Sequence, residues 1–140
     1  MNQSDKVTNS PKSFEVFPII ISKMKKDKRL TPADLTRLED LFGDRVQKAL
    51  ELVASKGITK FSFTPSGVER WVVSGHEKDY IVIENSFCSC KDFLFTALLR
   101  REAPSCYHLL AREIADLTDS FEEVKVEDNL YSSYMENWLE

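Results

Sequence analysis

The sequence has little of what marks a membrane-spanning protein or a secreted one. Its long apolar stretches, such as Phe93 to Leu99, fall far short of the roughly twenty residues that cross a bilayer as a helix. Residues 1–12 are too polar for the apolar centre of a secretory signal peptide. We therefore expect an intracellular, soluble protein.

Glycine is also scarce, and its placement excludes two large classes of nucleotide-binding enzyme. The chain has four glycines, and no segment matches G-x-x-x-x-G-K or G-x-G-x-x-G, the loops that hold phosphates in NTPases and dinucleotide-binding enzymes. A zinc-dependent nucleobase deaminase would need an H-x-E and a P-C-x-x-C segment, and the sequence has neither. We expect no enzymatic activity.

Basic residues do not outnumber acidic ones. The chain has 19 Lys and Arg against 23 Asp and Glu, which gives a formal net charge of −4. A protein that binds nucleic acid tightly by itself draws its affinity from many Lys and Arg contacts to phosphate, so any DNA contact is expected to be local or shared with a partner. The basic stretch from Lys23 to Arg29 and the pair Arg100 and Arg101 fit either a solvated helix surface or a phosphate contact.

The length of 140 residues fits one domain with a hydrophobic core, and the hydrophobic pattern predicts an α+β fold. Thr31, Pro32 and Asp34 are typical of the cap and first turn of a helix, and a second helix is expected after Gly43. The predicted organisation, in chain order, is a flexible tail (1–12), N-terminal helices (13–57), a three-stranded antiparallel β-meander followed by the segment that holds the cysteines (58–117), and an acidic linker with a C-terminal helix (118–140).

The meander is predicted from an alternation of period two. Phe61 and Phe63 alternate with polar residues, Pro65 to Gly67 form a turn, and two further apolar strands follow. Beyond them, Asp92 is expected to cap a short helix from Phe93 to Leu99. Because that helix is apolar nearly all round, we expect it to be buried.

The C-terminal segments are also expected to be helical. One helix runs from about Cys106 to Leu117, and Asp128 is expected to cap a last helix after the acidic linker. The large aromatic residues of that last helix either cover the protein's own core or dock a partner, because aromatic side chains suit both roles. They are Tyr131, Tyr134 and Trp138.

All three cysteines lie within one short stretch. Cys88 and Cys90 are separated from Cys106 and His108 by fifteen residues, in the pattern C-x-C-x15-C-x-H. An odd number of cysteines in a chain without a secretory signal argues against a disulfide framework. Three thiols and one imidazole form the Cys3His ligand set of a tetrahedral zinc ion. The sequence therefore predicts one structural zinc ion held by these four residues.

The spacing also predicts how the ligands are placed. In an extended chain, residues two apart point to the same side, so Cys88 and Cys90 can reach one ion, whereas on a helix they would point apart. Cys106 should therefore precede a helix, and His108 should lie in its first turn. The alternatives are three unrelated buried thiols and a cysteine nucleophile, which metal coordination would consume. His76, the other histidine, is expected to be solvated in a loop.

With Ala111 three positions after the histidine, this pattern resembles the SWIM zinc finger. The segment Leu41-Phe42-Gly43, the Pro65-Ser66-Gly67 hairpin and the run from Cys106 to Ala111 further resemble the small SWIM-domain subunits of the Shu recombination complex. The resemblance covers roughly Leu38 to Leu117. It implies that the three cysteines and the histidine are zinc ligands and that Ala111 completes the motif.

Proteins of that family are non-enzymatic partners of RecA-type recombinase paralogues, and their complexes promote recombinase filaments on single-stranded DNA during homologous recombination and DNA repair. The resemblance implies such an obligate partner here, single-stranded DNA reached through the complex, and a place in the nucleus. Tyr107 is a departure, because many relatives carry a basic residue there. The alternative function is an autonomous DNA-binding zinc finger protein, with Arg100 and Arg101 as phosphate contacts and a steep salt dependence.

Overall fold

A computed structural model describes residues 18–75, 78–83, 87–101 and 105–139. The flexible tail predicted for residues 1–12 and the solvated histidine predicted at position 76 lie outside these residues. The described part contains helices and a mixed five-stranded sheet, which confirms the predicted α+β fold class.

In chain order, the described helices are residues 18–27, α2 (Pro32–Phe42), α3 (Arg45–Ala54), the π-helix η1 (Phe93–Leu99), α4 (Tyr107–Thr118), the short 3-10 helix η2 (Asp128–Leu130) and α5 (Tyr131–Leu139). The strands are β1 (Ile58–Thr64), β2 (Glu69–Ser74), β3 (Asp79–Ile83), β4 (Phe87–Cys88) and β5 (Glu122–Glu127).

The sheet has the order β4-β3-β2-β1-β5. Its centre is the predicted antiparallel meander of β1, β2 and β3, to which β4 adds a short antiparallel edge. The segment expected to be an acidic linker instead contains β5, which pairs in parallel with β1. Val124 and Val126 lie opposite Phe61 and Phe63 in that pairing, and these apolar pairs stabilise a strand that is otherwise charged.

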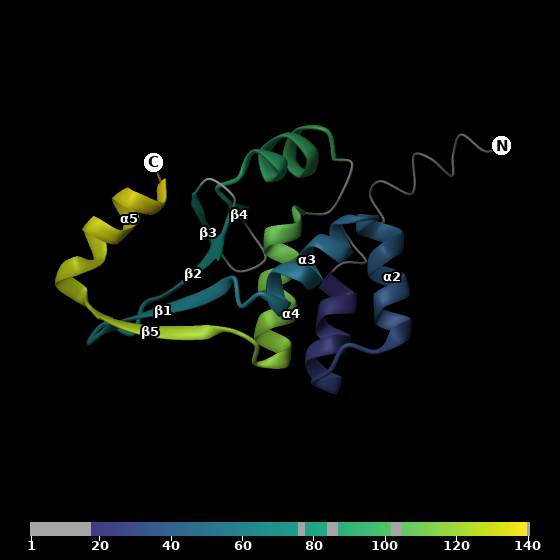
Figure 1. Cartoon of the computed structure of the whole chain (residues 1–140), viewed down its shortest axis with the longest axis horizontal. Coiled ribbons are helices and arrows are strands. Elements are labelled where there is room, and N and C mark those ends of the chain that lie inside the picture. The colour runs from purple at the N-terminus through teal and green to yellow at the C-terminus, as the bar shows by residue number, and fades with distance from the viewer. Residues whose placement is uncertain (1–17, 76–77, 84–86, 102–104, 140) are drawn as a thin grey trace.

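Two cores lie on opposite faces of the sheet (Figure 1). Alternate residues of β2 separate them: Trp71 and Val73 belong to the larger core, whereas Val72 belongs to the smaller one. The larger core lies against α2, α3, α4 and the helix over residues 18–27, and it includes all three cysteines. The smaller core is covered by α5, so the aromatic residues of that helix cover the protein's own core, with Trp138 only 6% exposed.

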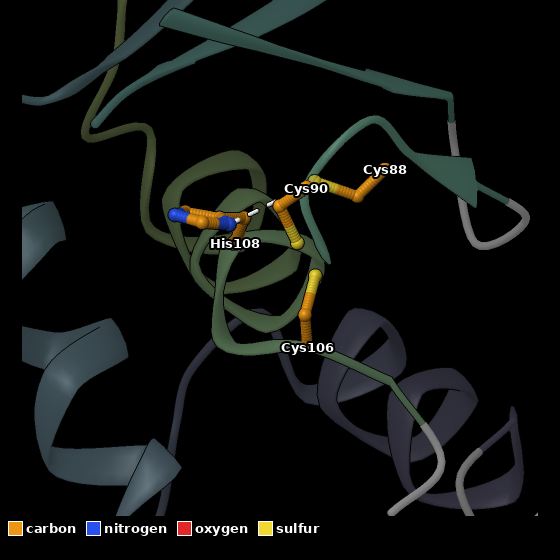
Figure 2. Close-up of side chains that lie close together, drawn as sticks. All are labelled: Cys88, Cys90, Cys106 and His108. Atoms are coloured by element: carbon orange, nitrogen blue, oxygen red, sulfur yellow. Dashed lines mark hydrogen bonds between the residues drawn. The ribbon is translucent and has the colours of Figure 1, made fainter. Parts of the chain in front are cut away.

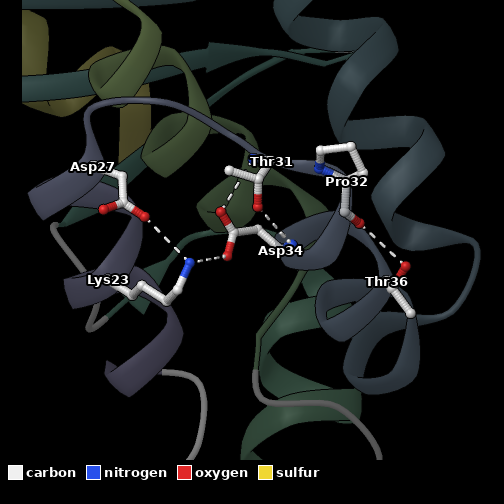
Figure 3. Close-up of polar contacts among 6 residues, drawn as sticks. All are labelled: Lys23, Asp27, Thr31, Pro32, Asp34 and Thr36. Carbon is white, nitrogen blue, oxygen red and sulfur yellow. Dashed lines mark hydrogen bonds and ion pairs between the residues drawn. The ribbon is translucent and has the colours of Figure 1, made fainter.

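The start of α2 confirms the predicted cap (Figure 3). The backbone N–H of Asp34 donates to Thr31 Oγ1 at 3.1 Å, and the Thr31 N–H donates back to the Asp34 carboxylate at 3.1 Å. Pro32 occupies the first turn, where its missing N–H costs no helical hydrogen bond. This reciprocal cap fixes the start of α2. Lys23 of the helix over residues 18–27 also donates to Asp34 and joins the two helices.

The segment from Phe93 to Leu99 is helical as predicted, but the expectation that it is buried is wrong. Only the side of the helix that faces the core is buried, and it carries Phe93 and Ala97. The rest of the helix exposes its apolar side chains by 44% to 65%, at Leu94, Phe95, Leu98 and Leu99. The prediction was wrong because a helix that is apolar all round is buried on every side only if other elements surround it.

Two acidic residues predicted as helix caps have other roles. Asp92 makes no side-chain cap, and instead its carboxylate accepts two hydrogen bonds from Arg45, at 2.9 and 3.1 Å. Asp128 accepts hydrogen bonds from the N–H and hydroxyl of Ser66, at 3.0 and 2.8 Å. Both therefore join segments distant in the sequence: Asp92 links η1 to α3, and Asp128 links the end of β5 to the β1–β2 turn.

None of the described helices is both long enough and apolar enough to cross a membrane.

Candidate metal centre

Two segments of the backbone bring the four predicted ligands together (Figure 2). Cys88 ends the edge strand β4, Cys90 lies in the bend that follows it, and Cys106 and His108 come from the start of α4. Cys106 is the N-cap residue in an extended conformation, and His108 lies in the first turn, as the spacing predicted. The cysteines and the histidine are all buried.

The ligand atoms lie close to the separations that a bound zinc ion imposes. All four lie within 4.8 Å of one another, and Cys88 Sγ is 3.7 Å from His108 Nδ1. A tetrahedral ion with bonds of about 2.3 Å to sulfur and about 2.0 Å to nitrogen would hold its ligand atoms about 3.5 to 3.8 Å apart. The donor set and the geometry therefore fit one zinc ion, with Nδ1 as the histidine's ligand atom.

Two tyrosine rings hold the imidazole of His108 in place. The ring centroid of Tyr107 is 4.2 Å from that of His108, and the centroid of Tyr80 is 4.8 Å away. The other ring nitrogen, Nε2, is buried and has no hydrogen-bond partner among the described residues. Coordination through Nδ1 would leave Nε2 as the protonated nitrogen, so the tyrosine rings, and not a hydrogen bond, orient this ligand.

The surroundings of the thiols favour a bound cation. Hydrogen bonds with Cys106 and Cys90, together with burial, raise the pKa of Cys88, and burial raises the pKa of Cys106 to about 12. Hydrogen bonds from Cys106 and Cys88 lower the pKa of Cys90, whose sulfur also accepts from the Phe93 N–H at 3.3 Å. A divalent ion among the three sulfurs would favour the deprotonated form of each thiol.

The helix that carries two of the ligands also favours the charged site. Three thiolates and a neutral imidazole on Zn²⁺ leave one net negative charge, next to the positive end of the α4 dipole. Ala111 and Ala115 are fully buried, so α4 packs deep in the larger core behind the ligands. With four protein ligands the tetrahedron is full, which is typical of a structural zinc site.

The other residues considered from sequence lie away from this cluster. Arg100 and Arg101 are exposed at the C-terminal end of η1. The aromatic residues of α5 lie on the opposite face of the sheet, in the smaller core. The structure therefore separates the predicted ligands from the predicted phosphate contacts.

Comparison with known proteins gives the family. No protein-family model matches the chain. A Dictyostelium discoideum homologue of zinc finger SWIM domain-containing protein 7 is 28% identical over 135 residues, covering 95% of this chain and 85% of that protein. The human protein of that name is 29% identical over 116 residues, with 81% and 82% covered, and the mouse protein is 31% identical over 120 residues, with 81% and 78% covered. The chain belongs to this family.

Membership confirms the resemblance to SWIM zinc finger proteins and agrees with the geometry of the cluster. The relatives are named as zinc finger proteins, and the chain has a buried Cys3His set whose ligand atoms lie close together. Both observations indicate one structural zinc ion in this SWIM-family chain. That Cys88, Cys90, Cys106 and His108 are its ligands stays a prediction, which the metal analysis proposed below tests.

Sequence reasoning missed two features of this SWIM-family centre. It did not find that Tyr80 packs on His108, because the two lie on different elements and 28 positions apart in the sequence. It also treated η1 as part of the core. The available signal was the position of Lys91 and Asp92 just before η1: charged residues at the start of a short apolar helix place that end near the surface.

Proposed function

We propose that this chain is a non-enzymatic, zinc-binding subunit of a Shu-type recombination mediator complex in the nucleus. In that role it would bind a RecA-type recombinase paralogue and, through the complex, promote recombinase filaments on single-stranded DNA in homologous recombination and DNA repair. Family membership and the closed ligand set support the proposal. The absence of an NTP-binding loop from the sequence fits a partner that supplies the ATPase.

The observation that carries the proposal is the exposed apolar face of η1. We call this face, made of Leu94, Phe95, Leu98 and Leu99, the docking face; its side chains are 44% to 65% exposed. Contiguous apolar side chains at the surface of a soluble protein commonly mark a protein–protein interface. A RecA-type partner with an apolar groove would bury this face.

The zinc centre would hold the docking face in position. Cys90 lies directly before η1 and accepts a hydrogen bond from Phe93, the first residue of that helix. Asp92 fixes the same end to Arg45 of α3 through two hydrogen bonds. Removal of zinc would therefore release the start of η1, and partner binding would depend on the metal although the metal contacts no partner atom.

Co-purification tests the proposal. The variant Leu98→Ser/Leu99→Ser should fold and hold zinc like the wild type, because both side chains are exposed, yet fail to retain a co-expressed RecA-type recombinase paralogue. Leu139→Ser, an equally exposed leucine on α5, is the matched control and should retain it. If the zinc-loaded wild type retains no recombinase paralogue, the proposed function is wrong.

The autonomous DNA-binding alternative makes a different prediction. It requires tight binding of the isolated chain, with a steep salt dependence that weakens when Arg100 and Arg101 are replaced. The net charge of −4 disfavours it. An isolated chain that binds DNA tightly without a partner would support the alternative over the subunit.

A further inference from the structure

A row of aromatic rings and lysines crosses the surface beside the zinc centre. Tyr107 and Tyr80 flank His108, with ring centroids 4.2 and 4.8 Å from the imidazole. An ammonium group lies near each tyrosine: Lys48 Nζ is 5.9 Å from the ring centre of Tyr107, and Lys78 Nζ is 5.7 Å from that of Tyr80. Both tyrosines are half-buried, so part of each ring is accessible.

Two hollows adjoin along this row. One has a volume of about 620 Å³ and includes Lys48, and the other has a volume of about 460 Å³ and includes Lys78 and Lys91. Tyr107 and Gly75 line both, so the hollows meet at the tyrosine.

The charges that line the hollows are mainly positive. Three lysines contribute to them, against the carboxylates of Glu51 in the first hollow and Asp92 in the second. Asp92 is already bound by the guanidinium of Arg45, at 2.9 Å. The zinc-loaded centre adds one negative charge, because its ligand Cys90 also lines the second hollow. Among the described residues the row keeps a small positive surplus, on a chain whose net charge is negative.

Aromatic rings interleaved with lysines suit single-stranded nucleic acid. Unpaired bases stack on aromatic rings whatever their sequence, and ammonium groups between the rings pair with the phosphates that follow the bases. Paired bases in a duplex offer no free faces for such stacking. With three lysines, the contact would be weak by itself and would add to the affinity of a partner.

We propose that this surface binds single-stranded DNA: a base displaces the Lys48 ammonium from its place over the Tyr107 ring and stacks there, and Lys48, Lys78 and Lys91 pair with the flanking phosphates. The inference rests on the proposed function, since it assigns a direct DNA contact to this subunit of the complex. The surface uses none of the side chains of the docking face.

Fluorescence anisotropy with a labelled oligothymidylate tests this surface. The zinc-loaded wild-type chain should bind with a dissociation constant between about 1 and about 100 μM. The variant Lys48→Gln/Lys78→Gln/Lys91→Gln should bind more weakly, and the slope of log affinity against log salt should fall by about 2, the share of three phosphate contacts on a single strand. Lys125→Gln, on the far edge strand β5, should bind like the wild type.

Stacking has its own test. Tyr107→Leu retains an apolar side chain against His108 but removes the aromatic ring, and it should lower the affinity about tenfold with the salt slope unchanged. Zinc content should be measured on the same samples, so that a loss of DNA binding is not a loss of metal. A triple lysine variant with wild-type affinity and slope, or a zinc-loaded wild type that does not bind, overturns the inference.

The two proposals fail in different assays. The triple lysine variant should still retain the recombinase paralogue, because its substitutions lie off the docking face. If the wild type retains the partner but the isolated chain does not bind DNA, the subunit role holds and the DNA surface is wrong. If the chain binds DNA through the lysines but retains no partner, the proposed function is wrong.

Discussion

Asp34 is a carboxylate with no exposed side-chain surface. Burial by itself would raise the pKa of Asp34, but hydrogen bonds from Thr31 and from the exposed Lys23 outweigh it and lower that pKa below its ordinary value of 3.8. The charged form is therefore the one that the fold stabilises. Thr31, Pro32 and Asp34 predicted the cap from sequence, whereas the contact with Lys23 depends on how two helices pack.

This arrangement predicts a pH-dependent cost for Asp34→Asn. The substitution should lower the free energy of unfolding by about 1 to 2 kcal/mol at neutral pH, because it removes a charged acceptor from a buried cap. Since the pKa of Asp34 is lower in the folded than in the unfolded chain, this stabilisation is present above the ordinary pKa and is lost as the pH falls through the folded pKa. Urea denaturation over a pH series measures it.

Asp27→Asn provides the matched control. Asp27 also pairs with Lys23, at 3.2 Å, but both side chains are more than a third exposed, so the pair contributes little. Its removal should change the free energy of unfolding by less than about 0.5 kcal/mol at any pH. Equal costs for the two substitutions would contradict the role given to the buried cap.

At the scale of elements, α4 carries a buried ion pair as well as two of the metal ligands. Arg112 Nη1 lies 2.7 Å from Glu113 Oε1, and both side chains are almost completely buried. The guanidinium also lies 4.5 Å from the ring centre of Trp71 in β2. This contact ties α4 to the sheet on the side of the larger core.

Removing one partner of this ion pair should lower the free energy of unfolding strongly. Arg112→Met should lower the free energy of unfolding by about 3 to 5 kcal/mol, because it leaves the Glu113 carboxylate buried without the guanidinium. Adding Glu113→Gln to Arg112→Met should recover much of that loss, since no buried charge remains. Urea denaturation of the single and double variants measures both, and a single substitution that costs less than about 1 kcal/mol would contradict this account.

The elements differ in how far the sequence alone predicts them. The alternation of Phe61 and Phe63 with polar residues predicted the meander, because successive side chains of a strand point to opposite faces of the sheet. Strand β5 could not be predicted in this way, because Val124 and Val126 lie among charged residues and form a strand only through pairing with β1. The exposure of η1 was missed for the same reason: burial depends on neighbours that are distant in sequence.

At the scale of the whole molecule, the metal centre lies in the larger core and joins β4, η1 and α4. The smaller core under α5 shares only the sheet with it. Removal of zinc should therefore raise hydrogen exchange first in β4, η1 and the start of α4, and later in β5 and α5. Exchange measured by mass spectrometry with and without a chelator tests this order, and a uniform rise across all elements would contradict it.

The candidate ligand set was predictable because its chemistry is local: four residues in two short segments present a complete set of soft donors. The surfaces beside it were not. Lys48 comes from α3, and Lys78 and Tyr80 come from the start of β3 and the bend before it. Only the folded chain places them next to His108 and Tyr107.

The zinc content of the purified chain tests the central claim most directly. Elemental analysis should find one zinc per chain in the wild type and none in Cys106→Ser, and the variant should lose the cooperative unfolding of the wild type, because structural zinc contributes about 10 to 16 kcal/mol. A wild-type chain that is folded, free of metal and carries three titratable thiols would contradict the account.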